Sequence, residues 1–379
     1  LGMQAATRFL VSPGSTQVFR TVERDGQVGS FEKLGGTVLA NACGPCIGQW
    51  HREDVDKGTS NSIVSSFNRN FPGRNDGNAE TLSFIASPEI VTAFAISGRL
   101  DFNPLVDTVK NAAGEEKLLA VPTGDSLPRE GFVNDVSGYV EPSADGSTVQ
   151  VEFDSASERL QLLKPFLPRK AAEYSHMRVL FKAVGKCTTD HISPAGPWLR
   201  FRGHLENISG NMFLGAVNAF HDGVGLGHDA TDGGTSRALH EIAARYRSAG
   251  DAWVVVGDEN YGEGSSREHA AMCPRFMGCG AVIVRSFARI HETNLKKQGI
   301  LALKFVDPAD FDQVQESDSV SIEEIESLAP GSEVTVTFHH ADGTEDRAQC
   351  SHTLSDSQVK WFWAGAALNT LRAGPEEKA

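Results

Sequence analysis

Apolar and polar positions along this chain define two regions that each predict a mixture of helices and strands. From residue 15 to about 100, short apolar runs such as TVLANACG (37–44) are separated by glycine-rich turns. Within this region Ser87, followed by Pro88 and Glu89, predicts the capped start of a helix. A second region of the same kind runs from about residue 176 to 379. The pattern therefore predicts an α/β fold in two parts.

The second region contains the clearest local patterns. Two β-branched runs, WVVVG (253–257) and AVIV (281–284), flank a segment in which a helix is expected to start near Ser265. This order is typical of two parallel strands joined by a helix. Further on, EVTVTFHHADGTEDRAQ predicts a β-hairpin that turns at Asp342-Gly343, and VKWFWAGAALNTL predicts a closing helix.

The segment between the two regions has a different composition. Residues 101–150 carry four prolines among many polar residues, which predicts a linker or an extended connection. A short helix is expected in SERLQLLKPF (157–166). The glycine-rich stretch GVGLGHDATDGG (223–234) lacks the spacing of a dinucleotide-binding loop and is expected to be a flexible surface loop.

Composition narrows the class of protein. The chain has 379 residues, enough for two or three domains, and no apolar stretch approaches the roughly 20 residues that cross a bilayer, so a soluble globular protein is expected. A net charge of -14 argues against a general nucleic-acid surface, so an anionic substrate would need a local arginine cluster. Six scattered cysteines indicate a reducing compartment rather than a disulfide framework. The start, LGMQAATRFL, has no leader and no initial Met, and we expect it to be a cut within a longer protein.

A CxxC pair, Cys43 and Cys46, lies at the end of an apolar run. Such a pair occurs as a redox dithiol, as half of a zinc ribbon, as two ligands of an iron-sulfur cluster, or as inert core residues. A zinc ribbon needs a second CxxC, whereas Cys273 and Cys279 are too far apart in sequence to form one. The spacing alone does not decide among the remaining alternatives.

Three further segments carry candidate anion-binding groups. In SFNRNFPGR (66–74), two arginines on a glycine-bearing loop either lie on a solvated surface or clamp carboxylates bidentately. In GDENYGEGSSREH (257–269), two serines and an arginine at an expected helix N-terminus favour an anion and a serine alkoxide, or simply form a capping box with Glu268. In GKCTTDHISPAGPWLRFRGH (185–204), a hydrolase triad is discounted because triad residues are seldom sequence neighbours.

Taken together, the segments NACGPCIGQW, SFNRNFPGRNDGN, GKCTTDHIS, GDENYGEGSSREHAA and SFARIHETNLKKQG resemble the aconitase family of the mitochondrial type over nearly the whole chain. The resemblance is to the C-terminal portion of that family. It implies that residues 1–105 are the C-terminal part of the cluster-bearing α/β core domain, that 106–175 are a linker, and that 176–379 are the family's swivel domain, of β/β/α type. The sequence departs from the family pattern at Phe67, at Ala79 and in the loop 223–234.

The resemblance also implies a cofactor, a reaction and a setting. The cofactor is a [4Fe-4S] cluster held by Cys43, Cys46 and a third cysteine upstream of this chain. The reaction is the isomerisation of citrate to isocitrate through cis-aconitate, in the tricarboxylic acid cycle, by a hydro-lyase. A monomer in the mitochondrial matrix is expected, or in the cytoplasm if the source is bacterial, with no membrane or nucleic-acid partner. The fragment alone is expected to be inactive without the N-terminal domains.

Residue roles follow from the same resemblance. Ser265 matches the family's catalytic base, and the histidines that protonate the leaving hydroxyl belong to the N-terminal domains. The substrate carboxylates are expected to bind six residues: Asn68, Arg69, Arg74, Arg202, Ser266 and Arg267. The alternatives are a homoaconitase or isopropylmalate isomerase relative, or a non-catalytic RNA-binding regulator on the same fold, which the net charge disfavours.

Overall fold

The chain divides into two compact units, residues 1–149 and residues 150–379. The structure, a computed structural model, describes residues 2–42, 44–48, 50–125, 127–265 and 267–372. Two of the expected site residues, Cys43 and Ser266, lie outside this part of the chain. The division falls inside the segment 106–175 that the sequence predicts to be a linker. The exact domain boundaries proposed from the sequence stay a prediction.

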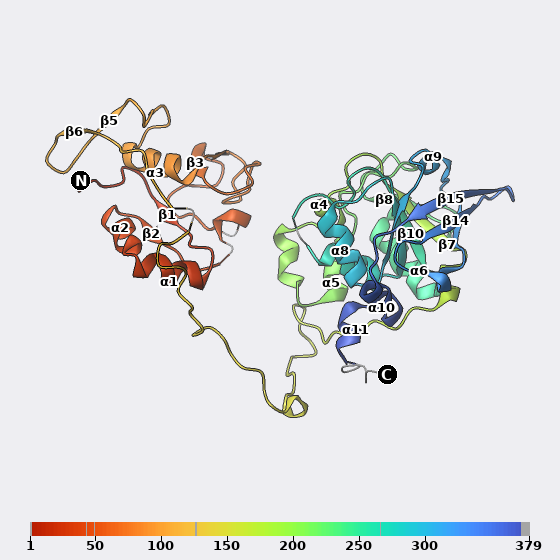
Figure 1. The fold of residues 1–379 in the computed structure, drawn as a ribbon. Helices are drawn as coiled ribbons and strands as arrows, with labels where there is room; N and C mark the ends of the chain where they lie inside the picture. Colours follow the sequence, from red (N-terminus) through yellow and green to blue (C-terminus); the bar gives the residue numbers. More distant parts are fainter. Residues whose placement is uncertain (1, 43, 49, 126, 266, 373–379) are drawn as a thin grey trace. The chain divides into compact units, whose positions relative to one another are not determined.

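The first unit is built from small two-stranded sheets and short helices (Figure 1). Strands β1 and β2 pair in parallel, β3 and β4 pair in parallel, and β5 and β6 form an antiparallel pair. Ser87 caps α3 as predicted, because its side chain accepts a hydrogen bond from the backbone N–H of Ile90. The elements are β1 (Leu10–Val11), α1 (Thr16–Arg24), α2 (Gln27–Lys33), β2 (Thr37–Val38), the 3₁₀ helix η1 (Pro45–Ile47), β3 (Asn61–Ser65), β4 (Thr81–Ile85), α3 (Pro88–Ser97), β5 (Thr108–Lys110), β6 (Glu116–Leu118) and η2 (Gly146–Thr148).

The second unit is a closed seven-stranded barrel with helices packed outside it (Figure 1). Strands β7, β10, β11 and β12 are parallel, and β15, β14 and β13 continue the sheet antiparallel until β13 pairs with β7. The strands are β7 (Met177–Lys182), β10 (Trp253–Gly257), β11 (Cys279–Val284), β12 (Leu301–Phe305), β13 (Ser319–Ile322), β14 (Glu333–His339) and β15 (Glu345–Ser351).

The remaining elements of this unit connect the strands or cover the barrel. Helices α6 and α7 precede and follow β10, and α8 follows β11. These elements are η3 (Ala171–Tyr174), α4 (Thr189–Ile192), η4 (Gly196–Phe201), α5 (Leu205–Ser209), β8 (Leu226–Asp229), β9 (Thr235–Ala238), α6 (Leu239–Ala249), α7 (His269–Phe276), α8 (Arg289–Lys297), α9 (Asp310–Gln313), η5 (Ile325–Ser327), α10 (Asp356–Ala364) and α11 (Ala367–Arg372). No helix in the described ranges combines the length and apolar character of a membrane span.

Alternation along the strands divides the core into two layers. On β10, Val254 and Val256 belong to the cluster inside the barrel, whereas Trp253 and Val255 belong to the cluster between the barrel and its helices. Successive side chains of a strand point to opposite faces, so a strand covered on both faces is apolar throughout. The continuous apolar runs that predicted these strands are therefore explained by burial on both sides.

Two local predictions in the second unit are confirmed. Strands β10 and β11 are parallel and are joined by a segment that contains α7. Strands β14 and β15 form an antiparallel hairpin, in which Gly343 has φ +86° and donates its N–H to the carbonyl of His340. Glycine suits this position because the left-handed region is costly for residues with a Cβ. The α/β class is thus confirmed.

The helix expected at 157–166 is absent, and the prediction was wrong. Within this segment Leu160, Leu162 and Leu163 are each at least half exposed, so they do not form the buried stripe of an amphipathic helix. Instead the chain is extended, and the N–H of Gln161 donates to the carbonyl of Gly203. The leucine spacing resembled a helical pattern, but these side chains are only about half covered by the rest of the unit.

The glycine-rich stretch 223–234 is also not the loop that was expected. It begins a hairpin of β8 and β9, in which the side chain of Asp229 is fully buried. The Asp229 carboxylate lies 2.5 Å from Nε of Arg245 and accepts a hydrogen bond from the N–H of Thr231. A buried charge must be paired and hydrogen-bonded, so these contacts order the segment.

The closing helix is two helices, α10 and α11, broken at Gly365. Gly365 has φ +91°, and a Cβ there would lie 2.2 Å from the carbonyl oxygen of Leu167. The same carbonyl accepts a hydrogen bond from the guanidinium of Arg275. Nearby, Arg169 donates to the carbonyl of Gly299 at 2.9 Å. These contacts anchor the chain around residues 167–169 to the rest of the second unit.

Candidate functional site

The loop that follows β10 carries Ser265 and has an unusual backbone. Asn260, Gly262 and Gly264 have φ values of +53°, +82° and +121°. Asparagine and glycine are the residues that adopt such conformations at least cost. The N–H of Tyr261 donates to the carbonyl of Ser286, so the loop is tied to the segment that follows β11. The sequence YGEG therefore sets the path of the chain toward Ser265.

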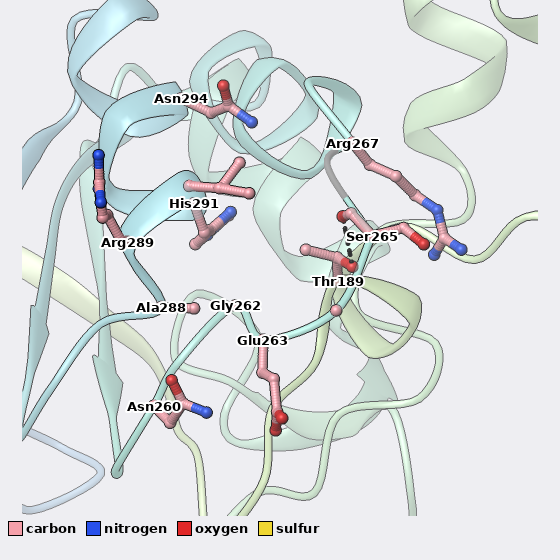
Figure 2. A pocket seen from close by; sticks show the side chains of 12 residues that line it. Thr189, Asn260, Gly262, Glu263, Ser265, Arg267, Ala288, Arg289, His291 and Asn294 are labelled. Atoms are coloured by element: carbon pink, nitrogen blue, oxygen red, sulfur yellow. Dashed lines mark hydrogen bonds between the residues drawn. The ribbon is translucent and has the colours of Figure 1, made fainter. Parts of the chain in front are cut away.

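A second contact fixes Ser265 itself. The hydroxyl of Thr189 donates to the backbone carbonyl of Ser265 at 2.9 Å (Figure 2). The N–H of Thr189 donates to the carbonyl of Glu263 at 2.8 Å. A Cβ at Gly264 would lie 2.9 Å from the Thr189 hydroxyl oxygen, so only glycine fits this approach. The side-chain hydroxyl of Ser265 makes no hydrogen bond to any described residue. It is therefore available to a ligand.

Arg267 supplies a cation on the same loop. One guanidinium nitrogen lies 2.5 Å from Oδ1 of Asp190 and also donates to the carbonyl of Ser193 at 3.4 Å. Asp190 lies on the short helix α4, whose N-cap Thr188 forms a capping box with His191. The cation is thus held in place by a carboxylate that an anionic ligand could replace.

These groups line a cavity of about 540 Å³ in the second unit (Figure 2). It opens to solvent and is bordered by the loop after β10, by α4 and by the start of α8. Two lining residues are cations and one is an acid, Glu263, which pairs with Lys186 at 3.1 Å. The lining is formed by Thr189, Asn260, Gly262, Glu263, Gly264, Ser265, Arg267, Ala288, Arg289, Ile290, His291 and Asn294.

The expected helix start at Ser265 was wrong. Helix α7 begins at His269, and no side chain caps it. The expected capping box does not form, because the carboxylate of Glu268 accepts a hydrogen bond from Gln298 at 2.8 Å. The free N–H groups of the first helical turn therefore follow Ser265 by several residues. They do not explain a stabilised anion at its hydroxyl.

Arg202 lies near the start of α7 but not in the lining of this cavity. It ends the 3₁₀ helix η4, and its carbonyl contacts Nε2 of His269 at 3.0 Å. Its side chain is exposed. Within the second unit, the structure therefore brings Ser265 and Arg267 together in one cavity and leaves Arg202 out of its lining.

The remaining expected residues lie in the first unit. Arg74 donates from Nε to the carbonyl of Cys46 at 2.8 Å, and Asn75 donates to the carbonyl of Pro45 at 3.1 Å. The arginine loop is therefore bound to the CxxC loop. The side chains of Asn68 and Arg69 have no hydrogen-bond or ion-pair partner among the described residues.

The residues of the CxxC segment fit an iron-sulfur cluster in part. Cys46 is a half-buried cysteine on the 3₁₀ helix η1. Thiolates are the ligands that such clusters require. Among the described residues, no group of three or more His, Cys, Asp or Glu side chains is arranged to hold a metal. The described residues thus include one cysteine of the kind such a cluster requires, and Cys43 lies outside them.

Several lining residues were missed by the sequence analysis, notably Thr189, His291 and Asn294. His291 and Asn294 belong to the segment SFARIHETNLKKQG, which contributed only to the family resemblance. The local pattern gave no signal, because a histidine on the apolar side of a helix is usually a core residue. Only the contact between α8 and the loop after β10 shows that they share a cavity.

Comparison with known proteins identifies the family. The profile of the Aconitase family (aconitate hydratase) matches residues 1–98, and that of the Aconitase C-terminal domain matches residues 177–308. The mitochondrial aconitate hydratase of Saccharomyces cerevisiae is 53% identical over 372 residues, which is 98% of this chain and 48% of that protein. The chain belongs to the aconitase family.

Two other relatives match over a similar share of the chain. The mitochondrial aconitate hydratase of Gracilaria gracilis is 53% identical, over 98% of this chain and 48% of its own length. The probable mitochondrial aconitate hydratase of Dictyostelium discoideum is 50% identical, over 100% of this chain and 49% of its own length. The chain thus spans about half the length of these relatives. A solved 3-isopropylmalate dehydratase of Methanocaldococcus jannaschii aligns at 21% identity over 52% of this chain and 92% of that chain, with a TM-score of only 0.34.

Gly262 offers a test of the loop geometry. A Cβ at this position would lie 2.2 Å from the ring of His291. Gly262→Ala combines this overlap with a left-handed backbone, so we expect the free energy of unfolding to fall by about 2 to 5 kcal/mol. Gly234→Ala is the matched control, because Gly234 has φ +78° but open space around it, and we expect it to lose only about 1 to 2 kcal/mol. Chemical denaturation of the chain measures both, and equal losses would contradict the close contact.

Proposed function

We propose that this chain is the C-terminal half of an aconitate hydratase that interconverts citrate and isocitrate through cis-aconitate. The observation that carries the proposal is that Ser265 and Arg267, a candidate base and a carboxylate-binding cation, line one cavity in a chain of this family. In this proposal residues 1–105 complete the cluster-bearing core, 106–175 are the linker, and 176–379 are the swivel domain. The chain acts together with N-terminal domains of the same protein.

Ser265 is the proposed base. It removes a proton from the carbon next to a substrate carboxylate, and the charge that develops moves into that carboxylate. A serine hydroxyl is a weak acid, so this role needs positive charge nearby. Arg267, two residues along the same loop, supplies such charge. The hydrogen bond from Thr189 to the Ser265 carbonyl supports the role, because it holds the loop in one conformation.

Substrate carboxylates bind the arginines. A tricarboxylate carries three negative charges, and taking them out of water requires matched guanidinium groups. Asn68, Arg69 and Arg74 of the first unit are proposed for this role with Ser266, Arg267 and Arg202 of the second. Arg267 releases Asp190 when it binds the substrate. Before the substrate binds, the ion pair with Asp190 holds the guanidinium in position.

A [4Fe-4S] cluster, which the family generally carries, supplies Lewis acidity toward the departing hydroxyl when it is bound. Cys43 and Cys46 are the proposed ligands in this chain, with a third cysteine upstream. The bond from Arg74 to the Cys46 carbonyl supports this assignment, because it joins a proposed ligand segment to a proposed carboxylate-binding residue. The relatives are named as mitochondrial proteins, which supports a mitochondrial location. We further propose that the full-length protein is a monomer.

Turnover of the full-length protein tests the function. We expect the cluster-loaded protein to form cis-aconitate from citrate and from isocitrate. Homologous acids with one more methylene, and isopropylmalate, should be poor substrates. Turnover of isopropylmalate in place of citrate would contradict the proposal.

Arg202→Lys tests the carboxylate assignment. Lysine keeps the charge but loses the planar pair of N–H donors, so we expect kcat/KM for citrate to fall by about tenfold to a hundredfold, as a charge-assisted hydrogen bond is lost. The exposed side chain means that the melting temperature should not change. Arg200→Lys is the control, since Arg200 is a neighbouring arginine without a proposed role. Unchanged kinetics for Arg202→Lys would remove this residue from the site.

A further inference from the structure

His291 lies beneath the loop that carries Ser265. It is on the first turn of α8 and only 2% exposed, with its ring 5.5 Å from that of Tyr261. The backbone of Gly262 approaches the ring so closely that no other residue fits there. Figure 2 shows the imidazole among the residues that line the cavity. The ring therefore forms part of the wall of the cavity that Ser265 also lines.

The two ring nitrogens of His291 differ in their surroundings. Nδ1 is enclosed and has no hydrogen-bond partner. Nε2 makes no hydrogen bond to any described residue and is not among the enclosed atoms. Burial lowers the pKa of His291 to about 4, because the charged form loses its hydration. At neutral pH the ring thus carries a single proton.

The position of that proton follows from the cost of burial. An enclosed N–H without an acceptor is rarer in proteins than an acceptor without a donor. The proton therefore belongs on Nε2, and Nδ1 keeps its lone pair. This tautomer presents an uncharged donor to the cavity.

The other lining groups favour an acceptor as the partner. Arg267 and Arg289 are cations, and the amides of Asn260 and Asn294 offer further donors. The single acid, Glu263, is already paired with Lys186. A cavity with this set of groups suits an anion that accepts hydrogen bonds.

We propose that His291 binds the substrate, donating a hydrogen bond from Nε2 to a carboxylate oxygen next to Ser265. The inference rests on the proposed function, because it takes the ligand to be a tricarboxylate. It adds to that function a binding residue that fixes the orientation of the acid without adding charge. A neutral donor leaves the alkoxide of Ser265 unprotonated, whereas an imidazolium would offer it a proton.

Two substitutions in the full-length protein separate the donor from the packing. Glutamine places an amide N–H near the position of Nε2, whereas leucine fills similar space without a donor. With tricarballylate, an unreactive tricarboxylate, as the probe, we expect His291→Leu to raise Kd by about tenfold or more, since hydrogen bonds to charged groups are worth this much. His291→Gln should stay within about threefold of the unsubstituted protein. Calorimetry measures Kd, and thermal unfolding of each variant reports any loss of folding.

A second measurement needs no variant. In full-length protein with ¹⁵N-labelled histidine, nitrogen shifts distinguish a protonated from an unprotonated ring nitrogen. We expect a protonated Nε2 that shifts when tricarballylate is added. A proton on Nδ1, or an Nε2 that does not respond to the probe, overturns the inference even if both variants fail to fold.

The outcomes also separate this inference from the proposed function. If the unsubstituted protein binds tricarballylate and both variants bind it equally well, the function stands and His291 has no role in binding. Equal weakening of both variants means that the ring only packs, and it overturns the inference. If the unsubstituted, folded protein does not bind tricarballylate, the proposed function fails and the inference fails with it.

Discussion

Replacing Ser265 with alanine in the full-length, cluster-loaded protein is expected to reduce kcat by about three orders of magnitude or more, with KM within roughly tenfold of its original value. The reason is that a base acts in the transition state, where proton removal occurs, and contributes little to binding of the ground state. The loop should keep its conformation, since Thr189 bonds to the backbone carbonyl and not to the hydroxyl of residue 265. Steady-state kinetics with citrate and isocitrate provide the measurement.

Two other serine substitutions test whether the loss of turnover is specific to Ser265. Ser248→Ala removes an exposed hydroxyl on α6 and should leave both constants unchanged. Ser266→Ala should act more on KM than on kcat, because Ser266 is proposed to bind a carboxylate. If Ser265→Ala kept near-normal turnover with an intact cluster, the base would have to be another residue.

Replacing Cys46 with alanine in the full-length protein is expected to abolish the cluster and, with it, all measurable turnover. The proposed cluster, held by three thiolates, would lose one of them, and among the described residues no group of three or more His, Cys, Asp or Glu side chains offers a substitute site. Iron and sulfide analysis, together with the visible absorbance of the purified protein, measures the loss directly. The readout does not depend on activity.

Cys350→Ala is the matched control for Cys46. Cys350 is buried inside the barrel, and burial raises the pKa of its thiol to about 12, so it is not available as a thiolate. Its replacement should lower stability slightly and leave the iron content unchanged. Full iron content in the Cys46 variant would show that the CxxC pair is not a ligand pair, and would return it to the redox and core alternatives.

The sequence predicted local structure best where the conformation depends on residues close together in the chain. The runs 253–257 and 281–284 predicted buried strands because β-branched residues in an unbroken apolar run suit a strand covered on both faces. Asp342-Gly343 predicted the hairpin because a residue with positive φ is needed at such a turn. In both cases the deciding forces act within a few residues.

The failures involve contacts between distant segments. The leucines of 157–166 have helical spacing, yet the second unit covers only about half of each side chain, and without a buried face a short helix is marginal. The stretch 223–234 has a flexible composition but is ordered by the pairing of Asp229 with Arg245. Closure of the barrel depends on the pairing of β13 with β7, which no local pattern contains.

In the candidate site, too, the local pattern predicted some residues, whereas contacts between distant segments were missed. Ser265 and Arg267 were predicted to act together, and they line one cavity. The helix start was misplaced, because the interaction of Glu268 with Gln298 competes with a cap that is visible in the sequence. His291 was missed because its place in the cavity depends on the packing of α8 against a loop that lies about 30 residues earlier in the chain.

The closed barrel of the second unit has a consequence for association between molecules. Each of its seven strands has a neighbour on both sides, so the sheet offers no row of unpaired N–H and C=O groups to another chain. Within this chain the two-stranded sheets of the first unit leave edges open, and Leu82, Phe84 and Ile85 on β4 are about half exposed. The barrel therefore resists edge-to-edge aggregation by its topology, which the open sheets of the first unit do not.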